Sequence, residues 1–169
     1  MSGPVRQRHD QTEIRIRPGD VTDVLRTLHD SVDFRFEILA DLAGVDTGRE
    51  MQVVYHLWGE GTPDWLRVIV VGISRDDPRC PSATFLWTGA EWLEREAYDM
   101  FGIVFEGNRD LRRIFMPPDY TSFPLRKDFL LPDDAARSPG EGVRQMERPY
   151  PPAVVADDPA AGIRRAPAS

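Results

Sequence analysis

Residues 94–128 have the sequence EREAYDMFGIVFEGNRDLRRIFMPPDYTSFPLRKD, and this stretch says more about the fold than any other part of the chain. Its charges gather in Glu94-Arg95-Glu96, Arg112-Arg113 and Arg126-Lys127-Asp128. Bulky apolar residues stand among them, namely Phe101, Ile103, Phe105, Ile114 and Phe115. Charged groups beside apolar ones are expected to pair while their neighbours pack. We therefore expect ion pairs, inside the domain or across a contact, and neither a metal site nor a catalytic triad.

A helix is predicted to begin just before this stretch. Thr88 followed by Glu91 has the spacing of a capping box, in which the hydroxyl and the carboxylate each accept a free backbone N–H. An apolar stripe follows, made of Leu93, Ala97, Met100 and Phe101. Gly102 suits a left-handed residue, so the helix is expected to end there.

Glu96 is expected to be the buried carboxylate of this helix, because it lies beside the apolar stripe. A buried carboxylate needs a cation or hydrogen-bond donors, or it is neutralised. The candidate cations are Arg112, Arg113 and Arg126. Glu91 and Arg95 are four residues apart and are expected to pair on the exposed side, contributing roughly 0.3 kcal/mol.

The residues before this helix predict a ladder of strands preceded by another helix. Asp20 can cap a helix whose apolar residues Val21, Val24, Leu25 and Leu28 fall on one face. Strands are predicted over residues 34–41, 51–58 and 66–73, with turns over 44–50 and 59–64. Short links favour antiparallel pairing, and the apolar run 66–73 is expected to be central. The fold class is therefore α+β, with a mostly antiparallel or mixed sheet, flanking helices and an extended, proline-rich C-terminal arm.

Composition predicts one domain with a tail at each end. Residues 1–12 are polar and lack periodicity, so they are expected to form a flexible N-terminal arm. The α+β domain is placed at residues 13–132. Residues 133–169 are rich in proline and alanine and have too few apolar side chains for a core, so we expect an extended or disordered tail, or one laid along a partner.

Charge and cysteine content limit the partners. A net charge of -7 argues against a nucleic-acid partner and against electrostatic docking on anionic lipid. The single cysteine, Cys80, excludes an intramolecular disulfide and a cysteine-ligated iron–sulfur cluster held by this chain alone. No apolar run approaches the ~20 residues that span a bilayer, so membrane association is expected to come through partners.

Other chemistries fit the polar residues less well. The histidines His9, His29 and His56 are widely spaced and lack accompanying acids or cysteines, which favours structural roles over metal binding. The basic residues Arg109, Arg112, Arg113, Arg126 and Lys127 lack a phosphate-binding loop and alternate with acids, which favours salt bridges. Glu94 and Asp99 diverge on a helix, which argues against a general acid–base pair.

The aromatic residues and the thiol are also expected to be structural. Trp58, Trp65, Trp87 and Trp92 fit a core or an interface better than a stack on a flavin or quinone. Arg79 could lower the pKa of the neighbouring Cys80 thiol. No base stands near Cys80 in the sequence, so a catalytic thiol is not expected.

Taken together, these motifs resemble the thirty-kilodalton subunit of respiratory complex I, the proton-pumping NADH:quinone oxidoreductase. The family pattern ERExxDMFGI is matched by residues 94–103. A DLRRI block at 110–114 and a PLRKD block at 124–128 follow in the same order. DLAGVD at 41–46 and VVYHLW at 53–58 are similar to the family's paired strands. The likeness covers about residues 20–132, and several separated blocks match at once.

The resemblance implies a structural subunit of the peripheral arm that binds no cofactor and has no active site of its own. It would pack on the large hydrogenase-like subunit and on the cluster-bearing subunit, on the cytoplasmic side of the cell membrane. The whole complex would use FMN, iron–sulfur clusters, NADH and quinone, and would couple electron transfer to proton translocation. The residues expected to fix the domain and its docking are Glu94, Arg95, Glu96, Asp99, Arg112, Arg113, Arg126, Lys127 and Asp128.

The sequence departs from the family at two positions. Asn108 and Phe123 stand where the two GHP blocks of the family carry histidine. This keeps open a homologous subunit of a membrane-bound hydrogenase or a reduced-deazaflavin dehydrogenase complex. A stand-alone hydrolase built on Glu96 and an arginine is a weaker alternative, because the sequence offers it no nucleophile.

Overall fold

The computed structural model describes residues 6–8, 11–33, 35–59 and 65–129. All of them belong to one compact unit, Met1–Phe129. The second unit, Leu130–Ser169, lies outside the described residues, and the predicted tail at 133–169 lies outside them with it.

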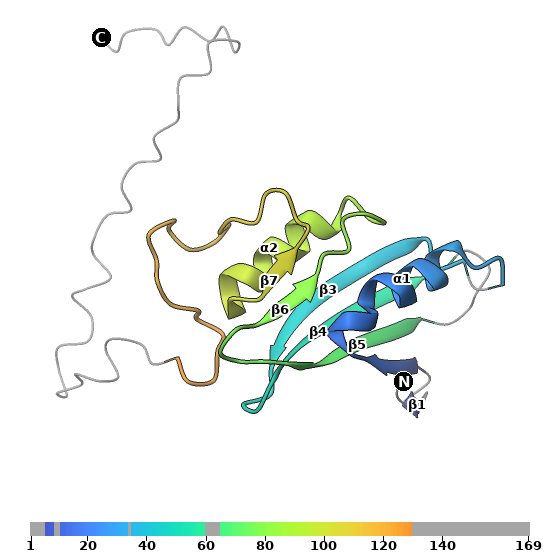
Figure 1. Ribbon diagram of the computed structural model, residues 1–169, viewed down its shortest axis with the longest axis horizontal. Helices are drawn as coiled ribbons and strands as arrows, with labels where there is room; N and C mark the ends of the chain where they lie inside the picture. The colour runs from blue at the N-terminus through green and yellow to red at the C-terminus, as the bar shows by residue number, and fades with distance from the viewer. Residues whose placement is uncertain (1–5, 9–10, 34, 60–64, 130–169) are drawn as a thin grey trace, which may run out of the picture. The chain divides into compact units, whose positions relative to one another are not determined.

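A five-stranded mixed sheet forms the centre of the described unit, with strand order β1-β2-β5-β4-β3 (Figure 1). The strands are β1 (Arg6–Arg8), β2 (Gln11–Ile16), β3 (Ile38–Asp46), β4 (Met51–Trp58) and β5 (Leu66–Ile73). The pairs β3–β4, β4–β5 and β1–β2 are antiparallel, whereas β2 runs parallel to β5. The α+β fold class is therefore confirmed.

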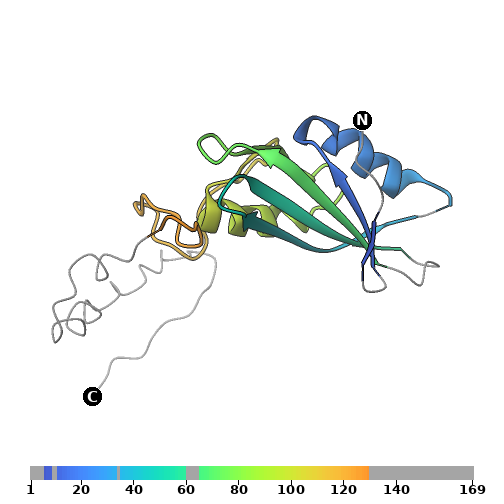
Figure 2. The ribbon, with the colours of Figure 1, turned by 90° about the horizontal axis from the view of Figure 1, so that it is seen from below.

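Two helices and a small second sheet accompany the main sheet. A 3-10 turn, η1 (Pro18–Asp20), leads into α1 (Val21–Asp30), and α2 (Ala90–Phe101) packs on β3. The strands β6 (Arg79–Pro81) and β7 (Val104–Glu106) pair in parallel. Figure 2 shows the segment after β7 beside the end of α2, and a hydrogen bond from Leu125 N–H to Met100 O joins the two.

The core lies between the helices and one face of the main sheet. In β4, Met51, Val53, Tyr55 and Leu57 are buried, while the residues between them are half-buried. This period of two gives the strand one packed face and one partly exposed face. Val21 and Leu25 of α1 join the same core as Ala90 and Ala97 of α2.

Two glycines allow α2 to end where it does. Gly102 has φ +76°, the left-handed conformation expected for it, and its N–H donates to Tyr98 O. Gly44 on β3 faces the end of the helix, because a Cβ there would lie 2.6 Å from Cδ2 of Phe101. A side chain at residue 44 would therefore force the Phe101 ring, or the end of α2 that carries it, to shift.

The structure confirms some predicted elements and corrects others. The strands at 51–58 and 66–73 have the predicted bounds, and β5 is the middle strand of the five. The strand predicted at 34–41 instead runs over Ile38–Asp46, so only residues 47–50 of the predicted turn are outside a strand. Residues 6–8 and 11–12, predicted to belong to a flexible arm, are in β1 and β2.

The predicted capping box is absent from α2. The N-cap is Gly89, and no side chain caps the helix. Thr88 takes part through its backbone carbonyl, which accepts the N–H of Glu91. Helix α1 is likewise preceded by Asp20 without a side-chain cap. Its predicted apolar stripe packs on the core, with Val21 and Leu25 buried and Val24 and Leu28 partly buried.

Candidate functional site

Helix α2 buries charged side chains on its inner face. Glu94 and Asp99 are 0% exposed and Arg95 is 4% exposed, whereas Glu96 is exposed. The prediction that Glu96 is the buried carboxylate is therefore wrong. The prediction took Leu93 as part of the buried face of α2, but Leu93 is only half-buried, and the buried face of the helix is rotated away from Glu96.

The Glu94 carboxylate is enclosed by hydrogen-bond donors from two segments. Its oxygens accept the Ser82 hydroxyl at 2.9 and 3.1 Å, the Ala83 N–H at 2.6 Å and the Asn108 amide at 2.8 Å. Burial raises the pKa of Glu94, and these hydrogen bonds offset part of that rise. Glu94 therefore joins α2 to the residues after β6 and to the residues after β7.

The Asp99 carboxylate organises the backbone of residues 114–116. Its Oδ2 accepts the N–H groups of Ile114, Phe115 and Met116 at 3.1, 2.7 and 2.9 Å. Its Oδ1 accepts Nη1 of Arg113 at 2.7 Å. Burial opposes ionisation of Asp99, but the four donors outweigh it and lower the pKa.

Arg113 completes this arrangement. Its guanidinium also donates to the carbonyls of Asp99 and Ser122, and it lies over the rings of Tyr120 and Phe123. Arg113 is thus the cation predicted for a buried carboxylate of α2, although its partner is Asp99 instead of Glu96.

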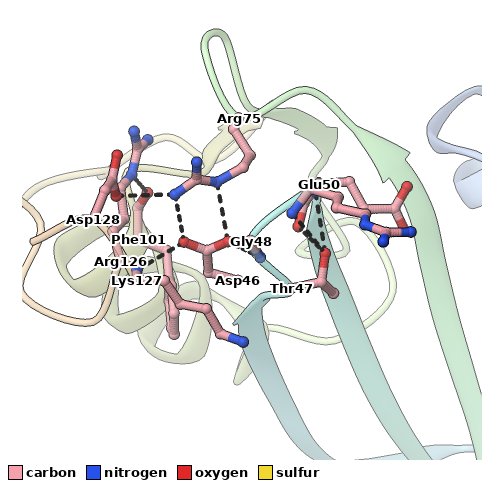
Figure 3. A network of polar contacts seen from close by, with 10 residues as sticks. Asp46, Thr47, Gly48, Glu50, Arg75, Phe101, Arg126, Lys127 and Asp128 are labelled. Carbon is pink, nitrogen blue, oxygen red and sulfur yellow. Dashed lines mark hydrogen bonds and ion pairs between the residues drawn. The ribbon is translucent and has the colours of Figure 1, made fainter.

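Asp46, at the end of β3, is a third buried carboxylate that sequence reasoning missed. Arg75 donates to both of its oxygens at 3.1 and 2.9 Å, and the N–H groups of Gly48 and Lys127 donate at 2.7 and 2.9 Å (Figure 3). Burial opposes ionisation, yet these donors lower the pKa of Asp46 from 3.8 to about 2. The one signal in the sequence is its place in the DLAGVD block.

The charged residues Arg126, Lys127 and Asp128 lie beside the Asp46 network, and some of their side chains are exposed to solvent. Arg75 Nη2 also binds Asp128 Oδ1 at 2.9 Å, and Arg126 Nε donates to Phe101 O at 2.6 Å (Figure 3). Lys127 takes part through its backbone N–H, and its side chain is exposed. Residues 126–128 therefore tie the chain to the ends of β3 and α2.

The remaining predicted residues, Arg95 and Arg112, lie at the other end of the segment. Arg95 does not pair with Glu91 on the exposed side as predicted. It is buried, donates from Nε to Arg112 O at 3.2 Å, and lies 4.5 Å from the ring centroid of Trp92. Arg112 is exposed and pairs with Asp110 at 2.9 Å.

The two positions where the family's histidines were expected are structural in this protein. Asn108 donates to Glu94 and accepts the N–H of Asp110. The guanidinium groups of Arg113 and Arg126 both lie over the Phe123 ring, with their central carbons 5.0 and 4.7 Å from its centroid. Both replacements therefore make contacts that hold the segment after β7.

Glu94, Asp99 and Asp46 together hold residues 107–129, which we call the 107–129 loop. Its contacts with them fall at Asn108, at residues 113–116 and at Lys127. Within the described ranges, no group of three or more His, Cys, Asp or Glu residues could hold a metal ion. Nor does any helix in those ranges combine the length and hydropathy of a membrane span.

The Cys80 thiol lies in the core and is not activated. Burial raises its pKa to about 12, and the neighbouring Arg79 pairs with Asp77 and Glu106. Its neighbour is the hydroxyl of the buried Tyr55, at 3.9 Å from Sγ. A thiolate nucleophile is therefore not available here at neutral pH.

Comparisons with known proteins agree on one family. The model of a family described as the 30 Kd subunit of respiratory-chain NADH dehydrogenase matches residues 14–135. The C subunit of NADH-quinone oxidoreductase from Roseiflexus castenholzii is 46% identical over 118 residues, which cover 68% of this chain and 67% of that protein. The C subunit of NADH-quinone oxidoreductase from Chloroherpeton thalassium is 48% identical over 96 residues, which cover 56% of this chain and 40% of that protein.

Two solved structures are similar to this one. A structure of Nqo5, described as a trypsin-resistant fragment (1-134), has a TM-score of 0.55 at 32% identity, covering 64% of this chain and 89% of that one. A polypeptide of the membrane-bound sulfane sulfur reductase, an archaeal respiratory membrane complex, has a TM-score of 0.66 at 26% identity, covering 79% and 80%.

Proposed function

This chain belongs to the family of the 30-kDa subunit of respiratory-chain NADH dehydrogenase, and we propose that it is a structural subunit that binds no cofactor, in the peripheral arm of an NADH:quinone oxidoreductase. The complex would pass electrons from NADH to quinone and couple this transfer to proton translocation. The observation that carries the proposal is that the buried carboxylates of α2 and β3 are all used to hold the 107–129 loop. Such an arrangement builds a rigid surface, and it leaves none of these carboxylates free for catalysis.

Membership of the family supports partners within the same complex. The protein would contact other subunits of the complex, chiefly the large hydrogenase-like subunit and the cluster-bearing subunit. FMN, iron–sulfur clusters, NADH and quinone would be bound by those other subunits. Attachment to the cytoplasmic side of the membrane would be peripheral, through partner subunits.

The predicted interface residues would divide into two roles. Glu94, Arg95, Asp99, Arg113 and Arg126 have their polar groups turned toward the chain itself, so they would shape the surface. The exposed residues Glu96, Arg112, Lys127 and Asp128 would be available to a partner. The contact of residues 133–169 with a partner remains a proposal, because these residues lie outside the described ranges.

A gene deletion in the source organism tests this proposal. Membranes without the protein should lose NADH:quinone reductase activity, and the full-length protein supplied in trans should restore it. The purified protein should show no absorbance band in the visible range. Unchanged activity after deletion, or a stoichiometric chromophore on the purified protein, would contradict the proposal.

The likeness to a polypeptide of the sulfane sulfur reductase favours one alternative, a homologous subunit of a membrane-bound complex with a different electron donor, such as a hydrogenase or a reduced-deazaflavin dehydrogenase. The deletion experiment separates the two. If this alternative holds, NADH oxidation by the membranes is unaffected, while oxidation of hydrogen or of reduced deazaflavin is lost.

A further inference from the structure

The last turn of α2 holds the 107–129 loop at two separate places. Asp99 accepts the N–H of Phe115 at 2.7 Å. One residue later in the helix, Met100 O accepts the N–H of Leu125 at 3.1 Å. The backbones of Phe115 and Leu125 are therefore both fixed to the same turn of α2.

Their side chains nevertheless face solvent. Phe115 is 61% exposed and Leu125 is 55% exposed. The contacts with α2 use only backbone N–H groups, so any residue type with such a group could make them. A large apolar side chain gains nothing from exposure to water, and because the backbone that carries it is already fixed, little backbone entropy is lost when a partner covers it.

The 107–129 loop that carries these two residues is basic in composition, although the protein as a whole is acidic. The 107–129 loop carries five arginine or lysine residues and three aspartates, whereas the whole sequence has a net charge of -7. Asp110 is paired with Arg112, and Asp128 with Arg75. The exposed cations of Arg109 and Lys127 make no ion pair with any residue that the structure describes, and neither does the exposed carboxylate of Asp119, so the unpaired exposed charges of the loop are two positive and one negative.

We propose that Phe115 and Leu125 are the apolar centre of a docking surface for a protein partner, with Arg109 and Lys127 as its cationic rim. The matching face is an apolar depression bordered by carboxylates. This inference rests on the proposed function and assigns the contact with the neighbouring subunit to the 107–129 loop. The buried carboxylates then act as positioning residues, and the binding itself is made by side chains that they hold outward.

Charge favours a different subunit as the partner over a second copy of this chain and over residues 130–169 of the same chain. In a symmetric contact with a second copy, the same patch meets itself, and the cations of Arg109 and Lys127 would face their own copies. Residues 130–169 of this chain carry six acidic and five basic side chains, so they offer little complementary charge. An acidic face on another subunit fits the observed charge better than either.

A photocross-linker tests the assignment in the native assembly. Full-length protein with p-benzoylphenylalanine in place of Phe115 is expressed in the source organism and irradiated in isolated membranes. The same substitution at Phe85, which is 45% exposed and lies before α2, is the control. We expect position 115 to cross-link to another subunit at a peptide that contains aspartate or glutamate, and position 85 not to reach that peptide.

Other cross-linking outcomes overturn the proposal. They are a cross-link to residues 130–169 of the same chain, a cross-link to a second copy, and no cross-link at position 115. If the wild-type protein is absent from the membrane complex altogether, the proposed function fails, and this inference fails with it. If the wild-type protein is present and position 115 is not covered, only this inference fails.

A substitution pair measures the energetic importance of the surface. Phe115→Ser should reduce the affinity of the protein for the complex by about tenfold to thirtyfold, whereas Phe85→Ser should leave it unchanged. The thermal midpoint of the isolated Phe115→Ser variant should equal that of the wild type, because the side chain is exposed. Equal incorporation of both variants would refute the assignment.

Discussion

The backbone N–H of Lys127 donates to Oδ2 of Asp46 at 2.9 Å, although 81 positions of sequence separate the two residues. The same carboxylate oxygen accepts Nη2 of Arg75, which also binds Asp128 (Figure 3). The end of β3 is thereby joined to the end of the 107–129 loop. Because one buried carboxylate serves both contacts, its loss should affect the sheet and the loop together.

Asp46→Asn should destabilise the domain by on the order of 3 kcal/mol, because it leaves a buried network without its charge. Asp41→Asn is the control, since Asp41 is on the same strand and exposed. Urea unfolding at pH 7 measures both. Equal unfolding midpoints would show that the network contributes nothing to stability.

The same carboxylate predicts how stability falls in acid. The pKa of Asp46 in the folded protein is lowered from 3.8 to about 2. Its contribution is therefore complete above pH 3.8 and is lost as the pH falls toward 2. The stability difference between wild type and Asp46→Asn should shrink over that window. A difference that stays constant from about pH 5 to 2 would contradict the assignment.

Glu94→Gln should destabilise the domain by about 1–3 kcal/mol, because a single amide oxygen cannot accept all the donors that surround the carboxylate. Glu96→Gln should change stability by less than about 0.5 kcal/mol, because Glu96 is exposed. Denaturant melts of the two variants compare neighbouring positions on one helix. A larger loss for Glu96→Gln would mean that the inner face of α2 has been misassigned.

The pKa of Glu94 is shifted in the opposite direction to that of Asp46, so its effect on stability has the opposite pH dependence. Its folded-state pKa is raised above 4.5 by burial, so its contribution is present below pH 4.5 and is lost as the pH rises through the folded value. The wild type should therefore lose stability as the pH rises above 4.5, and the Glu94→Gln variant should not show this loss. If both proteins have the same pH dependence from about 4 to 7, the pKa of Glu94 is not raised.

Asp99 and Arg113 should be energetically coupled, because they bind directly at 2.7 Å, and the side chains of Asp99 and Arg113 are only 0% and 9% exposed. A double-mutant cycle with Asp99→Asn and Arg113→Met should give a coupling energy of about 1–3 kcal/mol. Arg112→Met with Asp99→Asn is the control cycle, since Arg112 is exposed and pairs with Asp110. Coupling of similar size in both cycles would indicate a general charge effect instead of a specific pair.

Cys80 should be inert toward thiol reagents in the folded protein. It is fully buried, and its pKa is raised to about 12, so little thiolate forms at neutral or mildly alkaline pH. Reaction with Ellman's reagent should therefore proceed only as the protein unfolds, at a rate that rises with urea. Complete labelling within minutes in native buffer would contradict the burial of this residue.

Sequence patterns predicted the regular parts of the fold because those parts follow apolar periodicity. The alternation of Met51, Val53, Tyr55 and Leu57 indicated the correct bounds of β4, and the stripe of Val21 and Leu25 indicated the buried face of α1. The extent of β3 was missed because its last residues include Gly44 and Asp46, which are typical of turns.

The candidate site followed from the sequence only in outline. The sequence singled out the charged blocks of residues 94–128, and two of the buried carboxylates, Glu94 and Asp99, lie in them, but it did not identify which carboxylates are buried. Glu94 and Asp99 occupy core positions because Ser82, Asn108 and Arg113 satisfy them from distant segments. Helical periodicity locates the buried face from apolar residues alone, so it cannot detect partners in distant segments. It selected Glu96 because Glu96 lies beside the apolar stripe.

Affinity purification of the assembly from native membranes, with a tag on this protein, tests the central claim most directly. Mass spectrometry of the purified material should find the large hydrogenase-like subunit and an NADH-oxidising flavoprotein in one-to-one ratio with the tagged protein. Recovery of the tagged protein alone, or in a stable complex with unrelated proteins, would contradict its assignment as a structural subunit of an NADH:quinone oxidoreductase.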